Sequence, residues 1–195
     1  MTFETERLIA RPWRLDDADV SAAYRMYSDP EVMRFLGRNG ASDVVTSLEE
    51  QRERLEKFEE RYRTLPELQG WFVNPLELKA TQEVVGVILL KPLPDENDVY
   101  TSDIEIGWHL AKAHWGSGYA TEAAKGALRV GFEERGLTEI HAIAYAENLR
   151  SLEVMKRLGM TYLGPTSDYY GVTAEHFLLN REDWFRSRES GSASQ

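Results

Sequence analysis

Cysteine is absent from the 195-residue sequence. Its absence excludes disulfide bonds, zinc-thiolate and iron-sulfur sites, and a cysteine nucleophile. Long apolar runs are missing too, since none approaches the ~18 residues of a membrane-spanning helix. The first residues, Met1 to Glu6, lack the basic and apolar stretches of a signal peptide. We therefore expect a protein of the reducing cytoplasm that makes no membrane contact.

Positive charge is scarce relative to negative charge. The 23 Lys and Arg residues face 33 Asp and Glu residues, which gives a formal net charge of -10. Binding to nucleic acid depends on clustered cations that contact phosphates, so we expect no nucleic-acid partner. The same balance favours a cationic small molecule or peptide.

Three common catalytic motifs are also missing. Nothing matches the G-x-x-x-x-G-K-[ST] loop of nucleoside triphosphatases. Ser117 has Trp115 two residues before it, so the G-x-S-x-G turn of many hydrolases is absent. His109, His114, His141 and His176 show no H-E-x-x-H or similar metal-ligand spacing. We therefore predict no metal site.

The hydrophobic pattern predicts one domain over residues 1–186, because neither an internal repeat nor a linker is evident. The remaining Ser- and Gly-rich segment, Ser187 to Gln195, is expected to be disordered. Strands are predicted over 7–13, 71–78, 84–90, 102–110, 139–144, 161–164 and 172–179. Helices are predicted over 16–27, 42–62, from 118 or 119 to 131, and 148–158. This order indicates an α+β domain around one mixed sheet.

The predicted strand 102–110 alternates in polarity. Its apolar positions are Ile104, Ile106, Trp108 and Leu110, and the positions between them are Asp103, Glu105, Gly107 and His109. A period of two places these sets on opposite faces of a sheet. One face is expected to pack in the core and the other to meet something polar.

The segment HWGSGYATEAA, from His114 to Ala124, carries the clearest functional signal. Gly116 and Gly118 allow close backbone approach at the turn that enters a helix. Free N–H groups at a helix start, together with the helix dipole, favour a phosphate or pyrophosphate. A dinucleotide fold would need G-x-G-x-x-G, but Thr121 stands at the third glycine position. Glu139 lies at a suitable distance along the chain for the acidic residue that contacts a ribose in such a fold. That residue ends its strand, however, whereas Glu139 begins one.

From about Glu4 to Trp184 the chain resembles the GNAT superfamily of N-acetyltransferases, and in particular its ribosomal-protein-alanine N-acetyltransferase branch. The matching motifs are TERLIARPW, IEIGWHL, WGSGYATEA and AENLRSLEVMKRLGM, in that order. The resemblance implies a GNAT-like fold, a mixed central β-sheet flanked by helices on both faces. It also implies acetyl-CoA as co-substrate and transfer of its acetyl group to an amine.

The resemblance implies roles for particular residues. In the family the turn has the form [QR]-x-x-G-x-[GA], and its backbone amides hold the CoA pyrophosphate; here Trp115 replaces the usual Gln or Arg. Glu105 occupies a strand position from which a base acts, and Ser151 a position from which a hydroxyl protonates the leaving thiolate. The set expected to bind acetyl-CoA is Ile106, Gly107, Trp108, Trp115, Gly116, Ser117, Gly118, Tyr119, Ala120, Asn148 and Ser151.

Each role has a structural alternative. Glu105 could face solvent or pair with an arginine, Asn148 could be only a helix N-cap, and Ser151 could hydrogen-bond backbone. Tyr162, Tyr169 and Tyr170 are alternative acids, although packing or lining of the acceptor pocket also fits them.

The predicted reaction is direct attack of a primary amine on the thioester in a ternary complex. The acceptor stays open among protein N-termini, aminoglycosides, polyamines and amino acids. Its pocket walls are expected from 28–39, 42–62 and 169–176, where acidic residues would favour a cation. A non-catalytic acetyl-CoA-binding regulatory module is the alternative function, and a homodimer is an open prediction.

Overall fold

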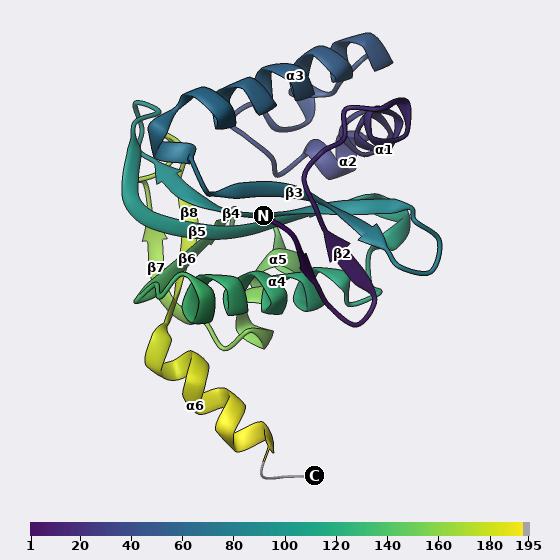
Figure 1. The fold of residues 1–195 in the computed structure, drawn as a ribbon. Helices are drawn as coiled ribbons and strands as arrows, with labels where there is room; N and C mark the ends of the chain where they lie inside the picture. Colours follow the sequence, from purple (N-terminus) through teal and green to yellow (C-terminus); the bar gives the residue numbers. More distant parts are fainter. Residues whose placement is uncertain (193–195) are drawn as a thin grey trace.

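The structure is a computed structural model that describes residues 1–192. Its centre is one mixed sheet of eight strands in the spatial order β1-β2-β3-β4-β5-β6-β8-β7 (Figure 1). All neighbours pair antiparallel except β5 and β6, which are parallel. The strands are β1 (Phe3–Glu4), β2 (Leu8–Ala10), β3 (Phe72–Leu78), β4 (Val84–Pro94), β5 (Tyr100–Leu110), β6 (Glu139–Ala144), β7 (Thr161–Thr166) and β8 (Ala174–Asn180).

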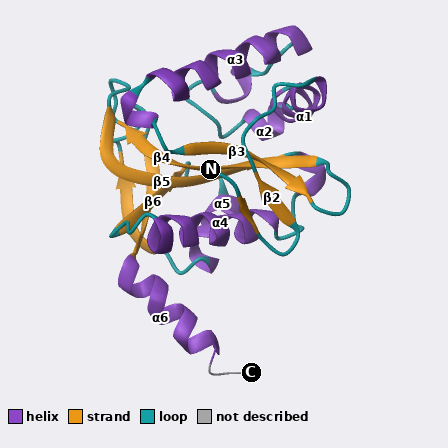
Figure 2. Cartoon of the chain, viewed as in Figure 1, coloured by secondary structure: helices purple, strands orange, loops and turns teal. Residues whose placement is uncertain are grey.

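Helices cover both faces of this sheet (Figure 2). They are α1 (Asp17–Tyr27), α2 (Pro30–Met33), α3 (Leu48–Thr64), α4 (Tyr119–Arg129), α5 (Leu149–Arg157) and α6 (Arg181–Ser192). Short 3₁₀ turns are η1 (Gly40–Asp43), η2 (Pro66–Leu68) and η3 (Lys112–His114), and a π-helical turn, η4 (Val130–Glu134), extends α4. The predicted fold class, a mixed sheet between helical layers, is confirmed.

Two apolar clusters fill the space on either side of the sheet. The larger joins the small residues of α4, such as Ala123, Ala124 and Ala127, to the strands and α5. Small side chains let a helix lie close to a sheet, which is why the alanine stripe of α4 is fully buried. The smaller cluster joins α1, α2 and α3 to β4 through Val20, Leu55 and Val87, among others.

Strands β5 and β6 are in register at a single pair, Glu105 and His141. On its other side β5 pairs with β4 through its whole length to Leu110. From Ile106 to Leu110, β5 therefore has a partner on one edge only. This open edge lies in the middle of the sheet, between the two helical layers.

The element predictions hold for most of the chain, with two corrections. Helix α3 begins at Leu48 and not at Ser42, because the Ser47 hydroxyl accepts from the Glu50 amide at 3.1 Å and caps the helix. At the start of this helix the Leu48 side chain is 49% exposed, whereas Gln51 is buried.

The second correction concerns the C-terminal segment expected to be disordered from Ser187. Helix α6 continues through it to Ser192. Trp184 packs on Phe132 with ring centroids 5.9 Å apart, and Arg188 forms an ion pair with Glu133, so contacts with the domain extend past Ser187. The last predicted tail residues, 193–195, lie outside the described residues.

A buried charge network ties the N-terminal strand to α1 and β3. Arg11 donates two hydrogen bonds to Asp19, at 2.7 and 2.8 Å, and one to Glu77 at 2.7 Å. All three residues are at most 7% exposed. Burial acts to raise the pKa of Asp19, but hydrogen bonds from Arg11 and the Arg14 amide outweigh it, so the pKa lies below its usual value.

None of the helices in the described part of the chain, residues 1–192, has the length and apolar character to cross a membrane.

We predict that Asp19→Ala lowers the free energy of unfolding by about 3–5 kcal/mol, because it leaves the buried Arg11 guanidinium without its bidentate partner. Denaturant unfolding at neutral pH measures the change. The matched control is Asp17→Ala in the same helical turn, where the exposed pair with Arg52 contributes at most about 1 kcal/mol. Equal losses for the two variants would contradict the prediction.

Candidate active site

Two cavities open from the edge of β5. We call the first, of about 560 Å³, the α3 cavity, because α3 forms one wall through residues such as Leu55 and Phe58. The second, of about 450 Å³, is the α5 cavity, lined by α5 and by the start of α4. The two meet at residues that line both: Phe35, Leu36, Trp108, His109, Asn148 and Ser151. A molecule in one cavity can therefore reach a molecule in the other.

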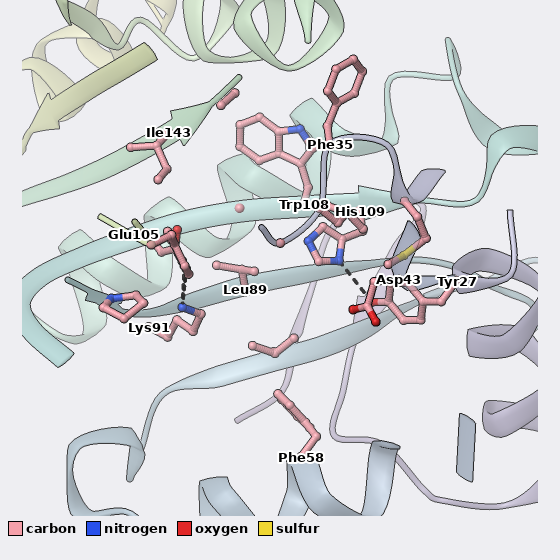
Figure 3. Close-up of a pocket in the computed structure, with 18 of the residues that line it drawn as sticks. Tyr27, Phe35, Asp43, Phe58, Leu89, Lys91, Glu105, Trp108, His109 and Ile143 are labelled. Atoms are coloured by element: carbon pink, nitrogen blue, oxygen red, sulfur yellow. Dashed lines mark hydrogen bonds and ion pairs between the residues drawn. The ribbon is translucent and has the colours of Figure 1, made fainter. Parts of the chain in front are cut away.

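The three segments expected to form an acceptor pocket come together around the α3 cavity. Met33 to Gly37 contribute from the first, Gln51 to Tyr62 from the second, and Tyr170 to Ala174 from the third. Figure 3 shows Phe35, Phe58 and Trp108 around this space. Nine aromatic side chains line it: Trp13, Tyr27, Phe35, Phe58, Tyr62, Tyr100, Trp108, Tyr145 and Tyr170.

The charge of this lining differs from the expectation of an acidic pocket. Three acidic residues, Asp43, Asp98 and Glu105, are matched by three basic ones, Arg54, Arg61 and Lys91. Asp43 pairs with Arg54 at 3.2 Å, and Asp98 pairs with Arg38 at 3.2 Å. The sequence excess of acid lies elsewhere, so the cavity itself does not select for a multiply charged cation.

Glu105 is the most buried charged group of the cavity lining, at 6% exposure. Its carboxylate contacts the Lys91 ammonium at 2.6 Å, drawn as a dashed line in Figure 3. Tyr170 donates its hydroxyl to the same carboxylate, and Lys91 also contacts the Tyr170 oxygen at 2.7 Å. Burial and the Glu105 charge raise the pKa of Tyr170 well above its usual value, so this hydroxyl keeps its proton. The sequence offered pairing with an arginine as the structural alternative for Glu105, and the structure gives it a lysine partner instead.

His109 lies two positions further along the same strand face beyond Gly107 and lines both cavities. Its Nδ1 is 3.1 Å from the Tyr27 hydroxyl. Burial, with a smaller contribution from the Lys91 charge, lowers the pKa of His109 to about 4. The ring is therefore neutral at pH 7. Sequence reasoning did not single out this residue, although the alternation of β5 places it on the face of Glu105.

The turn before α4 and the first residues of α4 line the α5 cavity through Trp115, Gly116, Gly118, Ala120 and Thr121. Gly116 and Gly118 have φ of +77° and +81°, a conformation that glycine adopts without strain. No side chain caps this helix. Within residues 1–192, the structure gives no hydrogen-bond acceptor for the amides of residues 116–121. Such amides at a helix start are suited to an anion.

Trp115 takes the place of a polar residue in the turn, and its surroundings supply a cation. Its indole N–H donates to the Leu110 carbonyl at 2.9 Å, which fixes the ring. The Arg150 guanidinium lies over that ring, 4.4 Å from its centroid. Arg150 and Arg157 both line the α5 cavity. Arg150 was missed from the sequence because nothing along the chain indicates that α5 reaches Trp115.

Asn148 and Ser151 stand where the two cavities meet. The Asn148 side chain accepts a hydrogen bond from the Ser151 amide at 3.3 Å, so Asn148 is the N-cap of α5. The cap uses the side-chain oxygen and leaves the amide group for other partners. The Ser151 hydroxyl makes no hydrogen bond with any described residue. The structural alternative, in which this hydroxyl bonds to the backbone, is therefore not what the structure shows.

The three tyrosines considered as acids lie in different places. Tyr162 is 53% exposed, lines neither cavity and donates to Glu175. Tyr169 is buried and donates to Asp103 at 2.7 Å. Tyr170 alone of the three lines the α3 cavity, and its hydroxyl is bound to Glu105.

Comparison with known proteins fits this geometry. Residues 7–161 match the family model described as an acetyltransferase (GNAT) domain. The chain is also 31% identical over 169 residues to the uncharacterized N-acetyltransferase p20 of Bacillus licheniformis, with 86% of each chain covered.

The chain belongs to the GNAT acetyltransferase family. It is an acetyl-CoA-dependent N-acetyltransferase, as its motifs predicted. A GNAT-family acetyltransferase from Bacillus anthracis has a similar structure, with a TM-score of 0.72 and 25% identity over 93% of this chain and 99% of that one.

The ribosomal-protein-S5-alanine acetyltransferase of Vibrio fischeri also shares the GNAT fold. Its TM-score is 0.68 over 94% of this chain and 98% of that one. At 17% identity this likeness concerns the fold alone.

We predict that His109 of this GNAT enzyme stays neutral down to about pH 4. Because the folded-state pKa lies below the unfolded value of about 6.5, unfolding takes up a proton between these values, so His109 lowers stability as pH falls through that window. Nitrogen-detected NMR of the imidazole between pH 8 and 4 measures the titration. Tyr27→Phe, which removes the hydroxyl at Nδ1, is the companion variant. A His109 midpoint near 6.5 in the folded protein would contradict the prediction.

Proposed function

We propose that the enzyme transfers the acetyl group of acetyl-CoA to a primary amine by direct attack in a ternary complex. The observation that carries this proposal is the meeting of the two cavities at Trp108, His109, Asn148 and Ser151. Acetyl-CoA would occupy the α5 cavity and the amine the α3 cavity. With no cysteine in the chain, a thiol acyl-enzyme has no nucleophile.

The α5 cavity has the groups that the coenzyme needs. The unbonded amides of Gly116 to Thr121 suit its pyrophosphate, with Arg150 and Arg157 adding positive charge. Ile106, Gly107 and Trp108 on the open edge of β5 would lie beside the acetyl group, where a backbone N–H can polarise the carbonyl. Asn148 would contact the pantetheine arm through its free amide.

Glu105 is the proposed base. It removes a proton from the acceptor ammonium, directly or through a water, and the neutral nitrogen attacks the thioester carbon. The C–S bond then breaks and the thiolate takes a proton from Ser151, while the acylated nitrogen loses its second proton to the Ser151 oxygen, directly or through a water. Glu105 releases the first proton to solvent, so the products are the neutral amide and free thiol. Ser151 is favoured over the tyrosines because its hydroxyl lies between the cavities and is unbonded, whereas Tyr169 and Tyr170 already donate to carboxylates.

The acceptor is proposed to carry its amine next to an apolar group. Nine aromatic side chains and a balanced set of charges line the α3 cavity, which favours one amine with apolar surroundings over a polycation such as a polyamine. A protein N-terminus or an amino acid with an apolar side chain fits this description. Turnover of a polyamine far above that of such amines would contradict it.

We predict that Glu105→Gln lowers kcat by about 10²- to 10⁴-fold with little change in the KM for acetyl-CoA. Gln keeps a polar partner for Lys91 and Tyr170 but cannot take the proton. Thiol release, measured across a pH series, reports the effect, and the fall in rate toward low pH that protonation of a general base causes should disappear.

The double variant Glu105→Gln/Lys91→Gln is the control for a purely structural role. If Glu105 served only to neutralise Lys91, removing both charges would restore turnover. Recovery of activity in the double variant would therefore contradict the assignment as base, and persistent loss with an intact circular dichroism spectrum would support it.

We predict that Arg150→Ala raises the Kd for CoA by about tenfold, the equivalent of about 1.4 kcal/mol, because a charge-assisted contact to phosphate is lost. Calorimetric titration measures the change. Arg129→Ala is the matched control, since Arg129 lies on α4, pairs with Glu134 and lines neither cavity. Equal Kd values for the two variants would place the phosphates elsewhere.

The alternative of a non-catalytic acetyl-CoA-binding module predicts a different result. Such a protein would bind CoA, with about 2.7 kcal/mol of stabilisation at 100 times its Kd, yet release no thiol with any amine in a broad panel. Thiol release together with the mass of an acetylated acceptor decides between the two.

A further inference from the structure

A cluster of potential metal ligands lies beside Glu105, on the side away from His109. Asp103 comes from β5, and Glu139 and His141 come from β6. One ligand atom of each lies within 4.8 Å of the others. No spacing along the chain indicates this group, because its members meet only through the parallel pairing of β5 and β6 at Glu105 and His141. The metal prediction from histidine spacing did not consider such a cluster.

The His141 ring is the centre of the cluster and is 6% exposed. Its Nδ1 makes a hydrogen bond with Nε2 of His176, at 2.9 Å, and the two rings stack with centroids 5.1 Å apart. Its Nε2 is buried and has no hydrogen-bond partner within residues 1–192. A buried polar nitrogen without a partner is costly.

That unpartnered nitrogen faces two carboxylates. Glu139 Oε1 is 3.4 Å from Nε2 and Asp103 Oδ1 is 4.0 Å from it. Both distances are too long for a hydrogen bond of good geometry. The Glu139 distance matches the separation of about 3.4 Å that tetrahedral ligands have when each bond to the metal is about 2.0–2.2 Å, and the Asp103 distance is longer than it.

The neighbours of the cluster hold the ligands in place. Tyr169 donates to Asp103 Oδ2 at 2.7 Å and leaves Oδ1 toward His141. When the Nδ1–H of His141 donates to His176, the Nε2 lone pair is directed at the carboxylates, and a cation between them removes the repulsion. The Glu139 side chain is 51% exposed, so an ion can enter from solvent.

We propose that Asp103, Glu139 and His141 form a binding site for a divalent metal ion of the zinc type, with His176 orienting His141 from outside the ligand set. One nitrogen and two oxygens suit Zn²⁺ or a related first-row ion, with solvent completing the coordination. The ion would join β5 to β6 at the only place where their backbones pair, next to the Glu105 carboxylate.

Calorimetric titration of the metal-free full-length protein with Zn²⁺ tests the site, with Co²⁺ absorption as a report on nitrogen and oxygen ligands. The expected result is one ion per chain. Glu139→Gln and Asp103→Asn should each raise the Kd at least about tenfold, and His176→Phe about 10- to 100-fold by freeing the His141 ring. Glu139 is half exposed, so its variant keeps the fold.

His114→Gln is the matched control. His114 Nε2 also lies 3.4 Å from a carboxylate, that of Glu83. Among the described residues, however, His114 and Glu83 belong to no group of three potential metal ligands. Its Kd should equal that of the parent protein. Equal Kd values for the parent and the Glu139 and Asp103 variants would overturn the proposal. NMR evidence that both His141 nitrogens keep their protons at pH 7 with excess Zn²⁺ would also overturn it, because the ring would then be an imidazolium paired with Glu139.

Discussion

The separation of β5 from β6 beyond Glu105 is the constraint on which the site depends. A sheet interior normally pairs both edges of each strand, but β5 keeps only its β4 partner from Ile106 to Leu110. The unpaired edge would be costly in a packed core, since buried backbone groups need partners. Here it borders two cavities, so its N–H and C=O groups meet ligand or solvent.

The side chains along one face of β5 lie in different environments. Asp103 faces β6 and Tyr169, Glu105 is held by Lys91 and Tyr170, and His109 meets Tyr27 near the open end. Gly107 between them has no side chain to fill the space. The strand thus carries three titratable groups on one face, two residues apart from Asp103 to Glu105 and four residues apart from Glu105 to His109, each with its own partner. Burial keeps His109 neutral, while the ammonium of Lys91 balances Glu105.

Local features of the sequence predicted much of this arrangement. The β5 alternation identified the polar face, and the Gly116–Gly118 turn identified the start of α4, because both depend on neighbours along the chain. Caps were harder to place: Ser47 rather than Ser42 begins α3 because a hydrogen bond to Glu50 decides the boundary. Contacts between distant segments had no local signal. Lys91 beside Glu105, Arg150 on Trp115 and His176 on His141 all arise from strand order and helix packing.

The charge of a site also depends on contacts between distant segments and not on the composition of the chain. A net charge of -10 describes the whole chain, yet the α3 cavity has equal numbers of acidic and basic lining residues. The largely buried pair of that lining is Glu105 with Lys91, and an unpaired buried charge costs far more than an exposed one. The excess of acid therefore lies outside the lining of this cavity. Composition limits the classes of partner, whereas the pairing of buried groups determines what a pocket can accept.

The adjacent residues Tyr169 and Tyr170 connect the two carboxylates of β5 to one loop. Tyr169 binds Asp103 and Tyr170 binds Glu105, so the loop between β7 and β8 contacts β5 at two successive positions on the same face. Through Tyr170 and Val172 the same loop lines the α3 cavity. A change in charge at either carboxylate alters the hydrogen bond that holds the loop, and with it the wall of the cavity. Glu105, the cluster around His141 and the wall of the α3 cavity are therefore parts of one connected set of contacts.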